Sequence, residues 1–371
     1  MPAVGKATVD GYDVDGVAGG PRGRRRSPAA RVGVAVVAVL AAACSSGRTA
    51  APVSAPRPRP TTPVAAVALA PRVAHGVVAP LTGLPTSKQA AARPALSVKV
   101  DNVAGALPQS GLQDADLVVD TPVEGGLTRL FVVFQSHAAS VVGPIRSARP
   151  VDADLLTMLR GGVFAYSGAD RREIRPVQAH GGAVLVSNDA QPQYFHRDPS
   201  RPAPHDVVSS TTRLYAAGQA LGSPKGPPPQ PFTFATGVPV GPRATSLDLS
   251  FGQARAAWRW NGTDYLRTQD GRPDVLRDGA RVTTTNIVVL GVRLAGTGIH
   301  DAAGNEDPLV VVTGSGACTV LRDGVVVTGT WHRPSYRTAL VLRDTRGKII
   351  ALKPGRTWVE LLPRGRRPLL R

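Results

Sequence analysis

The sequence contains little cysteine, few aromatic residues and no hydrophobic run long enough to cross a membrane. Two cysteines among 371 residues exclude the disulfide framework that stabilises many small secreted domains. The apolar run at residues 32–43 is too short for a transmembrane helix, which needs roughly 20 residues. There is also no Walker loop, no dinucleotide-binding fingerprint and no Gly-x-Ser-x-Gly elbow. Nucleotide-dependent and serine-hydrolase chemistries therefore have no support from motifs.

Acidic residues are scarce relative to basic ones. The chain has 44 Lys and Arg against 26 Asp and Glu, a formal net charge of +18. Such a charge favours anionic partners such as lipid head groups, acidic wall polymers or nucleic acid. The alternative explanation is genomic, because Arg far exceeds Lys and because Ala, Gly, Pro and Val are abundant, as in proteins from GC-rich genomes. Hydrophobic residues make up 42% of the chain, which is enough to form a core.

The N-terminal residues have the organisation of an export signal. Three arginines, Arg24-Arg25-Arg26, precede the apolar run at 32–43, and small residues lead directly into Cys44. A Cys after three small residues resembles a bacterial lipobox, in which the thiol is acylated and becomes the mature N-terminus. We therefore predict a lipoprotein signal peptide at 1–43, lipidation at Cys44 and a location on the extracytoplasmic face of the cell membrane. The alternative is ordinary secretion with a free thiol.

Composition divides the rest of the chain into four segments. Residues 44–78 are rich in Pro and Ala and are predicted to be a disordered tether. Residues 79–225 alternate strand and helix patterns, which predicts an N-terminal mixed α/β domain. The proline-rich run at 226–231 is predicted to be a stiff linker. Residues 232–371 contain short apolar runs separated by Gly and Asp, which predicts a mainly antiparallel β domain and an α+β fold class overall.

Several elements can be placed within these domains. A helix is expected after Pro150, because Asp152 and Asp154 suit a first turn, and a second is expected to run through 214–220 behind Ser209 or Ser210 as its cap. Asn261-Gly262 predicts a hairpin turn. The expected strands are 95–100, 115–120, 128–135, 163–166, 184–186, 286–290, 309–313, 318–321, 325–328, 339–342, 349–352 and 358–361.

A succession of short motifs resembles the YerB-like lipoproteins, a family of Gram-positive surface lipoproteins built on a domain of unknown function. The resemblance covers roughly residues 81–363 and implies a two-domain lipoprotein without an established activity. The family usually has Asn-Leu after its Pro-His pair, whereas this chain has Asp206-Val207. The motifs that carry the resemblance are Asp101-Asn102, Pro108–Leu112, Ala115-Asp116, Pro122–Arg129, Gly143–Pro150, Ala203–Asp206, Gly314–Ala317, Gly329–Trp331 and Gly355–Val359.

The segment Gly143–Pro150 holds Arg146 and Arg149 three residues apart between two prolines. Proline restricts the backbone, so both guanidinium groups are expected to be fixed in orientation. Two oriented guanidinium groups suit a phosphate or a carboxylate ligand. The alternative is that both arginines pair internally with nearby carboxylates and brace the edge of the sheet.

Polar residues at predicted strand ends are the other candidates. Asp120 and Glu124 flank a turn, where paired carboxylates suit acid/base chemistry such as glycoside cleavage, although they would equally neutralise nearby arginines. Asp101-Asn102 follows another strand and is expected to line the same cleft as His205. That histidine lies in a proline-rich loop and is a candidate general base. The alternative for the loop is a braced structure in which its histidines are hydrogen-bonded.

The same loop contains His196 and Asp198 beside His205 and Asp206, a set that suits either a divalent metal or a general base. No helical His-x-x-x-His pair and no cysteine pair accompanies it, so we predict neither a metal site nor a cofactor.

Three functions stay open. The first is an extracytoplasmic lipid-anchored protein that binds an anionic wall polymer or another anionic envelope component. The second is a hydrolase or transferase acting on cell-wall glycans, with Glu124 or His205 as the acid/base. The third is a structural adaptor for a membrane-protein partner. Export argues against nucleic acid as a partner, and no basic-aromatic recognition module is evident. The candidate ligand-binding residues are Arg146, Arg149, Asp101, Asn102, Asp120, Glu124 and His205.

Overall fold

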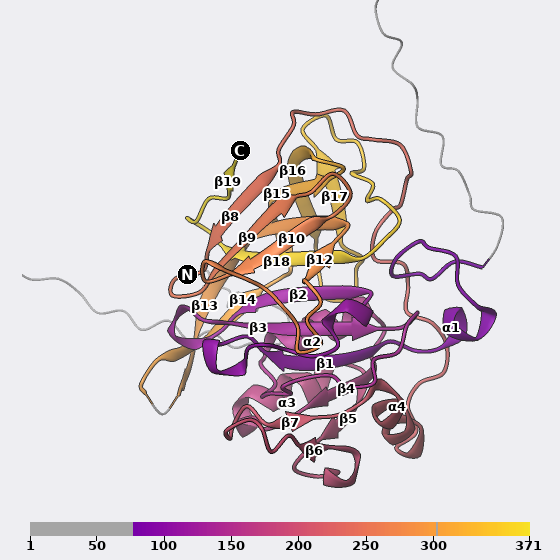
Figure 1. Cartoon of the computed structure of the whole chain (residues 1–371), viewed down its shortest axis with the longest axis vertical. Coiled ribbons are helices and arrows are strands. Elements are labelled where there is room, and N and C mark those ends of the chain that lie inside the picture. Colours follow the sequence, from indigo (N-terminus) through magenta and orange to yellow (C-terminus); the bar gives the residue numbers. More distant parts are fainter. Residues whose placement is uncertain (1–76, 302) are drawn as a thin grey trace, which may run out of the picture. The chain divides into compact units, whose positions relative to one another are not determined.

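The computed structural model describes residues 77–301 and 303–371. The predicted signal peptide, Cys44 and all but the last two residues of the predicted tether lie outside the described residues. Figure 1 shows the arrangement of the elements. The fold is α+β, with a mixed N-terminal part followed by a mainly antiparallel β part.

The N-terminal part contains all four described α-helices. Local sequence explains their starts: the Ser210 hydroxyl accepts a hydrogen bond from Arg213 N at 3.2 Å, and Asp152 and Asp154 occupy the first turn of another helix. Its elements are α1 (Lys88–Ala92), β1 (Leu96–Asp101), η1 (Ala104–Ala106), η2 (Leu112–Asp114), β2 (Leu117–Pro122), η3 (Glu124–Gly126), β3 (Thr128–Phe134), α2 (Val151–Met158), β4 (Gly162–Tyr166), α3 (Arg171–His180), β5 (Ala183–Ser187), η4 (Pro192–Tyr194), β6 (His196–Arg197), β7 (Val207–Val208) and α4 (Thr211–Ala220).

The C-terminal part consists of strands joined by turns. Asn261 starts the predicted hairpin turn, since its side-chain oxygen accepts hydrogen bonds from Thr263 N and Asp264 N between two antiparallel strands. The strands are β8 (Ser246–Ser250), β9 (Arg255–Trp260), β10 (Tyr265–Gln269), β11 (Arg272–Pro273), β12 (Thr283–Thr284), β13 (Asn286–His300), β14 (Glu306–Val311), β15 (Gly314–Arg322), β16 (Val325–Arg333), β17 (Val341–Asp344), β18 (Thr357–Pro363) and β19 (Leu369–Leu370).

One large sheet runs through both parts. Its strand order is β17-β16-β15-β13-β18-β2-β3-β1-β4-β5, with β14 paired to β13. The strand β18 lies between β13 and β2 and is parallel to both, so it joins the C-terminal strands to the N-terminal ones. A second, smaller sheet has the order β11-β10-β9-β8-β19, with β12 paired to β10.

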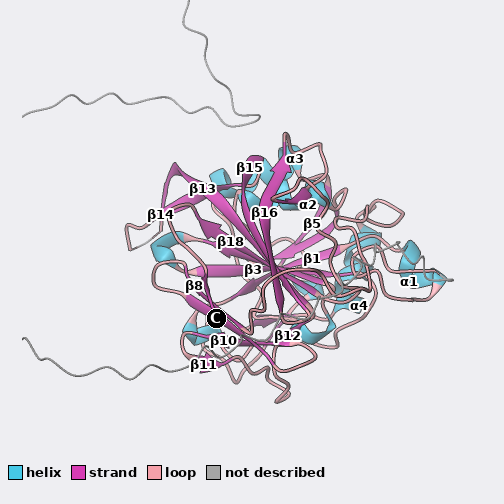
Figure 2. Ribbon diagram, turned by 90° about the horizontal axis from the view of Figure 1, so that it is seen from above, coloured by secondary structure: helices cyan, strands magenta, loops and turns pink. Residues whose placement is uncertain are grey.

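The large sheet separates two hydrophobic cores. Alternate residues of β1, such as Val98 and Val100, join a core with Leu214 of α4 and Trp258 of the small sheet. The opposite core contains Phe131 of β3 together with residues of α2 and α3. Figure 2 shows α2 and α3 close together, with α4 and α1 in another part of the view. Polar side chains that project from β1 toward α2 therefore enter a buried environment.

Most expected strands are present, and the differences from the expected elements include the following. The strand expected at 286–290 continues to His300, because its second half pairs with β14. Residues 349–352 form only isolated bridges, Arg343 to Ile349 and Phe234 to Leu352. The helix α3 was not expected, although Asp170 and Glu173 form a capping box at its start.

The proposed boundary at 226–231 stays a prediction. The described residues belong to one compact unit, and the pairing of β18 with β2 carries the large sheet across that boundary. In the described part of the chain, the helices are all too short or too polar to span a bilayer.

Candidate functional site

The segment containing Arg146 and Arg149 is fixed beside the end of β1. Asp101 N donates to Pro144 O at 2.8 Å, and Arg146 N donates to Lys99 O at 2.9 Å. On the other side, Ser167 N donates to Arg146 O at 3.0 Å. The segment therefore continues the hydrogen bonding of β1 where the pairing with β4 stops.

The structure brings together three predicted site residues at the end of β1. Asp101 Oδ2 lies 2.8 Å from His205 Nδ1 and 3.0 Å from Arg146 Nε. The side chain of Asp101 is only 1% exposed, whereas that of Arg146 is 23% exposed and that of His205 is 19% exposed. Asp101 therefore orients two cationic or potentially cationic groups that solvent reaches.

Asn102 lies beside this group but is used internally. Its Nδ2 donates to Thr128 Oγ1 at 2.7 Å, and its Oδ1 accepts from Gln109 Nε2 at 2.9 Å. Gln109 also donates to Asp101 O at 3.1 Å. These contacts hold the end of β1 against β3, so Asn102 positions Asp101.

Arg149 does not share the exposed position of Arg146. Its Nε donates to Glu124 Oε2 at 3.0 Å, its Nη2 donates to Glu124 Oε1, and its Nη1 donates to Ala148 O at 2.9 Å. Arg129 Nη2 reaches the same carboxylate at 3.0 Å. Of the two alternatives for this arginine, internal pairing is the one that the structure shows.

Glu124 is held ionised by this arrangement. Burial alone raises the pKa of a carboxyl group, but the hydrogen bond from Arg149 and the charges of Arg129 and Arg149 outweigh it and lower the pKa of Glu124 to about 2. A general acid needs a proton near neutral pH, so Glu124 is poorly suited to that role.

Two further carboxylates that were not predicted meet Arg149. Glu173 Oε1 lies 3.3 Å from Arg149 Nη1, and Asp307 Oδ1 lies 3.2 Å from Arg149 Nε. Burial is the main cause that raises the pKa of Asp307 to about 7. The charge of Arg149 lowers this pKa, but the negative charges of Glu124 and Glu173 on the same guanidinium group raise it. The capping-box position of Glu173 was a usable sequence signal, whereas nothing local marked Asp307.

A second buried pair supports the same region. Lys99 Nζ lies 2.8 Å from Asp152 Oδ1 and donates to Thr121 Oγ1 at 3.1 Å. Burial is the largest effect on Lys99 and lowers its pKa, although Asp152 opposes the shift. Asp152 Oδ2 also accepts from Arg149 N at 2.7 Å, which ties the start of α2 to the arginine segment.

Arg129 is the least satisfied cation of this network. Its side chain is 7% exposed, and its Nε and Nη1 have no hydrogen-bond partner among the described residues. Burial first, and then the charge of Arg149, lower its pKa, and the charge of Arg146 acts in the same direction. The guanidinium groups of Arg129 and Arg149 are thus close enough to repel each other, and the buried Nε and Nη1 donors of Arg129 have no acceptor among the described residues.

Asp120 does not join this group. It faces the small sheet, where its Oδ2 accepts from Arg267 Nη2 at 2.8 Å, and it lies opposite Glu360 of β18. Arg267 also pairs with Asp274 at 2.6 Å. All four side chains are buried, so the predicted cleft does not include Asp120.

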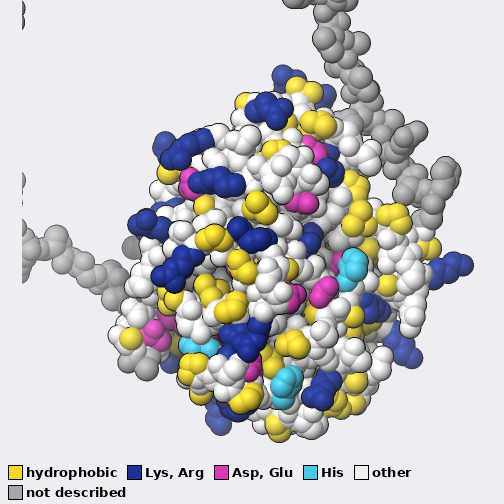
Figure 3. Space-filling model, viewed as in Figure 1, with side chains coloured by type: hydrophobic (Ala, Val, Ile, Leu, Met, Phe, Trp, Pro, Cys, Tyr) yellow, Lys and Arg dark blue, Asp and Glu magenta, His cyan; other side chains and the backbone are white. Residues whose placement is uncertain are grey.

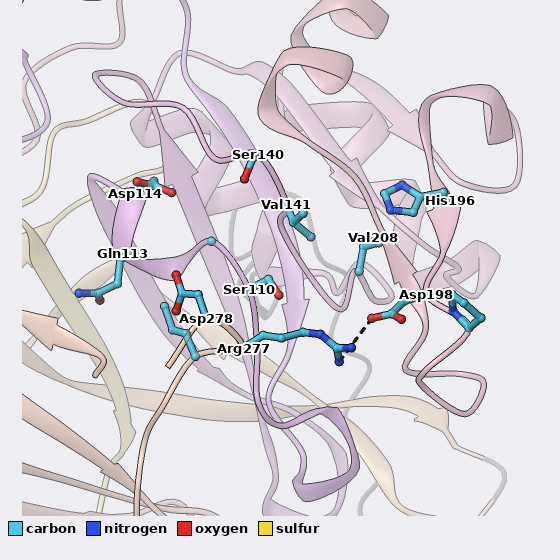
Figure 4. Close-up of a pocket in the computed structure, with 13 residues that line it drawn as sticks. Ser110, Gln113, Asp114, Ser140, Val141, His196, Asp198, Val208, Arg277 and Asp278 are labelled. Carbon is cyan, nitrogen blue, oxygen red and sulfur yellow. Dashed lines mark ion pairs between the residues drawn. The ribbon is translucent and has the colours of Figure 1, made fainter. Parts of the chain in front are cut away.

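The loop histidines separate. His205 lies against Asp101, whereas His196 and Asp198 line a pocket of about 520 Å³ between the loop and the turn at Arg277 (Figure 4). Asp198 pairs with Arg277 at 3.5 Å across one side of this pocket, and Asp114 lies on the other side in the same view. Within residues 77–301 and 303–371, no group of three or more His, Cys, Asp or Glu side chains is placed to hold a metal ion.

Two further residues with reactive or ligand-stacking side chains, Cys318 and Trp258, lie in the core. Cys318 is a buried free thiol, and burial raises its pKa to about 12, so it is unreactive as a nucleophile. Trp258 packs edge-on against Trp358 with 5.2 Å between ring centroids. It is therefore part of the core and presents no surface for stacking on a sugar.

Comparison with known proteins gives consistent matches along the chain. Residues 81–223 match the model described as "Protein of unknown function (DUF3048) N-terminal domain", and residues 247–359 match the corresponding C-terminal domain model. A Bacillus subtilis protein named "Putative lipoprotein YerB" is 26% identical over 303 residues, which cover 79% of this chain and 88% of that protein. The crystal structure of YerB superimposes with a TM-score of 0.68 at 25% identity and covers 79% of this chain and 99% of that one.

Proposed function

This chain belongs to the DUF3048 family, whose function is unknown, and we propose from its own residues that it is a lipid-anchored, extracytoplasmic protein that binds an anionic component of the cell envelope. The anchor is Cys44, supported by the lipobox-like sequence and by the lipoprotein name of the Bacillus relative. The binding residues are Arg146 and Arg129, with His205 beside them.

The unsatisfied guanidinium group of Arg129 is the observation that carries the proposal. A buried donor without an acceptor costs free energy, and a buried cation next to another cation costs more. An anion placed between Arg129 and the partly exposed Arg146 would accept the free N–H groups and relieve the repulsion. Arg149 contributes indirectly, because it occupies Glu124 and so limits how far that carboxylate neutralises Arg129.

The charge of the surface supports an anionic partner. Lys and Arg predominate over Asp and Glu on the face drawn in Figure 3. Long-range attraction of this kind brings an anionic polymer to the protein, and oriented guanidinium groups then bind it. A wall polymer or an acidic glycan satisfies both requirements.

The test is retention on isolated cell walls. We expect Arg146→Gln to lower the affinity of the protein for walls about tenfold, the loss typical of one charge-assisted hydrogen-bonding group. Arg346→Gln is the matched control, because Arg346 is exposed on a turn and its substitution removes the same charge. Equal retention of Arg146→Gln and the native chain, with both folded, would refute the proposed site.

The anchor has its own test. Cys44→Ser is expected to move the protein from the membrane fraction to the soluble extracytoplasmic fraction, as followed by fractionation and intact-mass spectrometry. An unacylated native protein found only in the cytosol would contradict the anchoring.

A further inference from the structure

A groove lies beside α4, away from the arginine cluster. It has a volume of about 1080 Å³ and is lined by residues 87–94, by the loop after β3 and by one side of α4. Figures 1 and 2 both place α1 close to α4. Its lining on α4 includes Thr211, Thr212, Tyr215 and Gln219, whose spacing follows the helix along its length. The groove therefore suits an extended ligand.

The charge of this groove has one sign. Arg93, His137 and Lys225 line it, and its lining includes neither Asp nor Glu. The pKa of His137 is raised, chiefly by its hydrogen bond to Asp116, which favours the imidazolium form. The first turn of α4 adds the positive end of a helix dipole. An anion at this position would meet favourable charge from several directions.

Most donors at the start of α4 are used internally, since Thr211 N donates to Ala139 O at 3.1 Å and Arg213 N donates to Ser210 Oγ at 3.2 Å. The exposed Thr212 is the residue of this first turn that is left for a ligand. Thr211 Oγ1 accepts from Ala139 N at 3.0 Å, which fixes the loop containing His137 against the helix start. Arg93 Nη2 donates to His137 O at 2.7 Å, which fixes the guanidinium group of Arg93. Its Nη1 is left for a ligand. The His137 side chain is 63% exposed, and its internal contacts, to Ser136 Oγ at 2.8 Å and Asp116 Oδ1 at 3.8 Å, are both made by Nδ1, so Nε2 is the ring nitrogen left for a ligand.

We propose that the groove between α1 and α4 is a second binding site, independent of Arg146, that binds a phosphate ester through Arg93, His137, Lys225 and Thr212 of the first turn of α4. A tetrahedral phosphate presents oxygens to donors that approach from different directions, whereas a carboxylate is planar. The apolar residues in the groove, among them Pro94 and Ala216, pack against the organic part of the ester. The chain's own residues 44–76 are unsuited to the groove because they contain arginines and no acidic residue.

The first experiment uses the full chain with Cys44→Ser and a soluble probe, glycerol phosphate. Isothermal titration measures affinity, and NMR follows the Thr212 amide and the His137 imidazole. We expect saturable binding that the double substitution His137→Gln and Lys225→Gln weakens at least tenfold. His332→Gln is the control, because His332 is exposed on β16, and it is expected to bind like the parent chain. Absence of saturable binding, equally tight binding of acetate or an equal loss in the control each overturns the proposal.

The second experiment identifies the source of the phosphate. Vesicles with and without phosphatidylglycerol in phosphatidylcholine are compared for the parent chain and the double variant. If the double variant loses phosphatidylglycerol-dependent binding, the ligand of the groove is a lipid head group. If the substitutions weaken only the binding of glycerol phosphate, the ligand is a soluble ester. Both outcomes support a phosphate site. Arg146→Gln is expected to leave the Thr212 response unchanged. Failure of the envelope-binding proposal and failure of this one are therefore distinguishable.

Discussion

Replacement of Glu360 by Gln is expected to stabilise the protein increasingly as pH rises. Glu360 and Asp120 lie opposite each other on β18 and β2, fully buried, and one oxygen of each, Glu360 Oε2 and Asp120 Oδ1, has no hydrogen-bond partner among the described residues. A proton shared between the two oxygens would satisfy both. Burial, followed by the charge of Asp120, raises the pKa of Glu360 to about 8, and burial raises that of Asp120 to about 6.

The sign and size follow from linkage. The folded-state pKa of Glu360 lies above the model value of 4.5, so folding takes up a proton at neutral pH. The contribution of Glu360 to stability is then largest at low pH and falls by up to about 1.4 kcal/mol per pH unit as pH rises from 4.5 toward 8. The amide of Gln does not ionise, so the variant does not show this pH-dependent loss of stability. It also keeps an oxygen for the hydrogen bond from Trp258 Nε1 (2.8 Å to Glu360 Oε1 in the native chain) and offers an N–H to Asp120.

The assay is chemical denaturation followed by tryptophan fluorescence from pH 5 to pH 8. The advantage of Glu360→Gln over the native chain is expected to grow across this range. Three pH units at about 1.4 kcal/mol each set an upper limit of about 4 kcal/mol, and sharing of the titration with Asp120 lowers the gain below that limit. Glu306→Gln, on the exposed side of β14, controls for the change in net charge. A difference in stability that stays constant with pH would refute the protonated state of Glu360.

Two further predictions concern the N-terminal network. Glu124→Gln is expected to destabilise the protein by about 3 kcal/mol at pH 7, because it leaves the buried Arg129 without its carboxylate partner and removes the nearest carboxylate of Arg149. Since the pKa of Glu124 is lowered to about 2, this loss of stability should shrink as pH falls from 4.5 toward 2. Chemical denaturation of both chains at pH 3 and pH 7 measures it. An equal loss at the two pH values would contradict the reasoning. Lys99→Met is expected to cost about 3–5 kcal/mol by leaving Asp152 unpaired, and adding Asp152→Leu should recover most of it. Additive losses in a double-mutant cycle would contradict that coupling.

Local patterns were sufficient to predict much of the fold. Ser210 was one of two candidate caps for α4, and the acidic first turn placed α2, because both signals act within one helical turn. The hairpin at Asn261-Gly262 was predictable for the same reason. The length of β13 was not, since its second half depends on pairing with β14 rather than on its own residues.

The candidate site was only partly accessible from sequence. Asp101, Arg146 and His205 do converge, as strand ends and neighbouring loops suggest, although Asp101 and His205 are 104 positions apart. Asp307 and Glu360 were missed because each meets a partner far away in the sequence: Asp307 contacts Arg149 through its side chain, and Glu360 lies opposite Asp120 through the pairing of β18 with β2. Arg149 and Arg146 look equivalent in sequence, and only the packing of Glu124 distinguishes them.

The central position of β18 has a consequence for the timing of folding. This strand spans residues 357–363, yet it covers the edge of β2, which is made some 240 positions earlier. During synthesis that edge has no native neighbour until the residues of β18 have been made. Until then the exposed edge of β2 is open to pairing with another chain, so a chain that stays unfolded until β18 is complete avoids that risk.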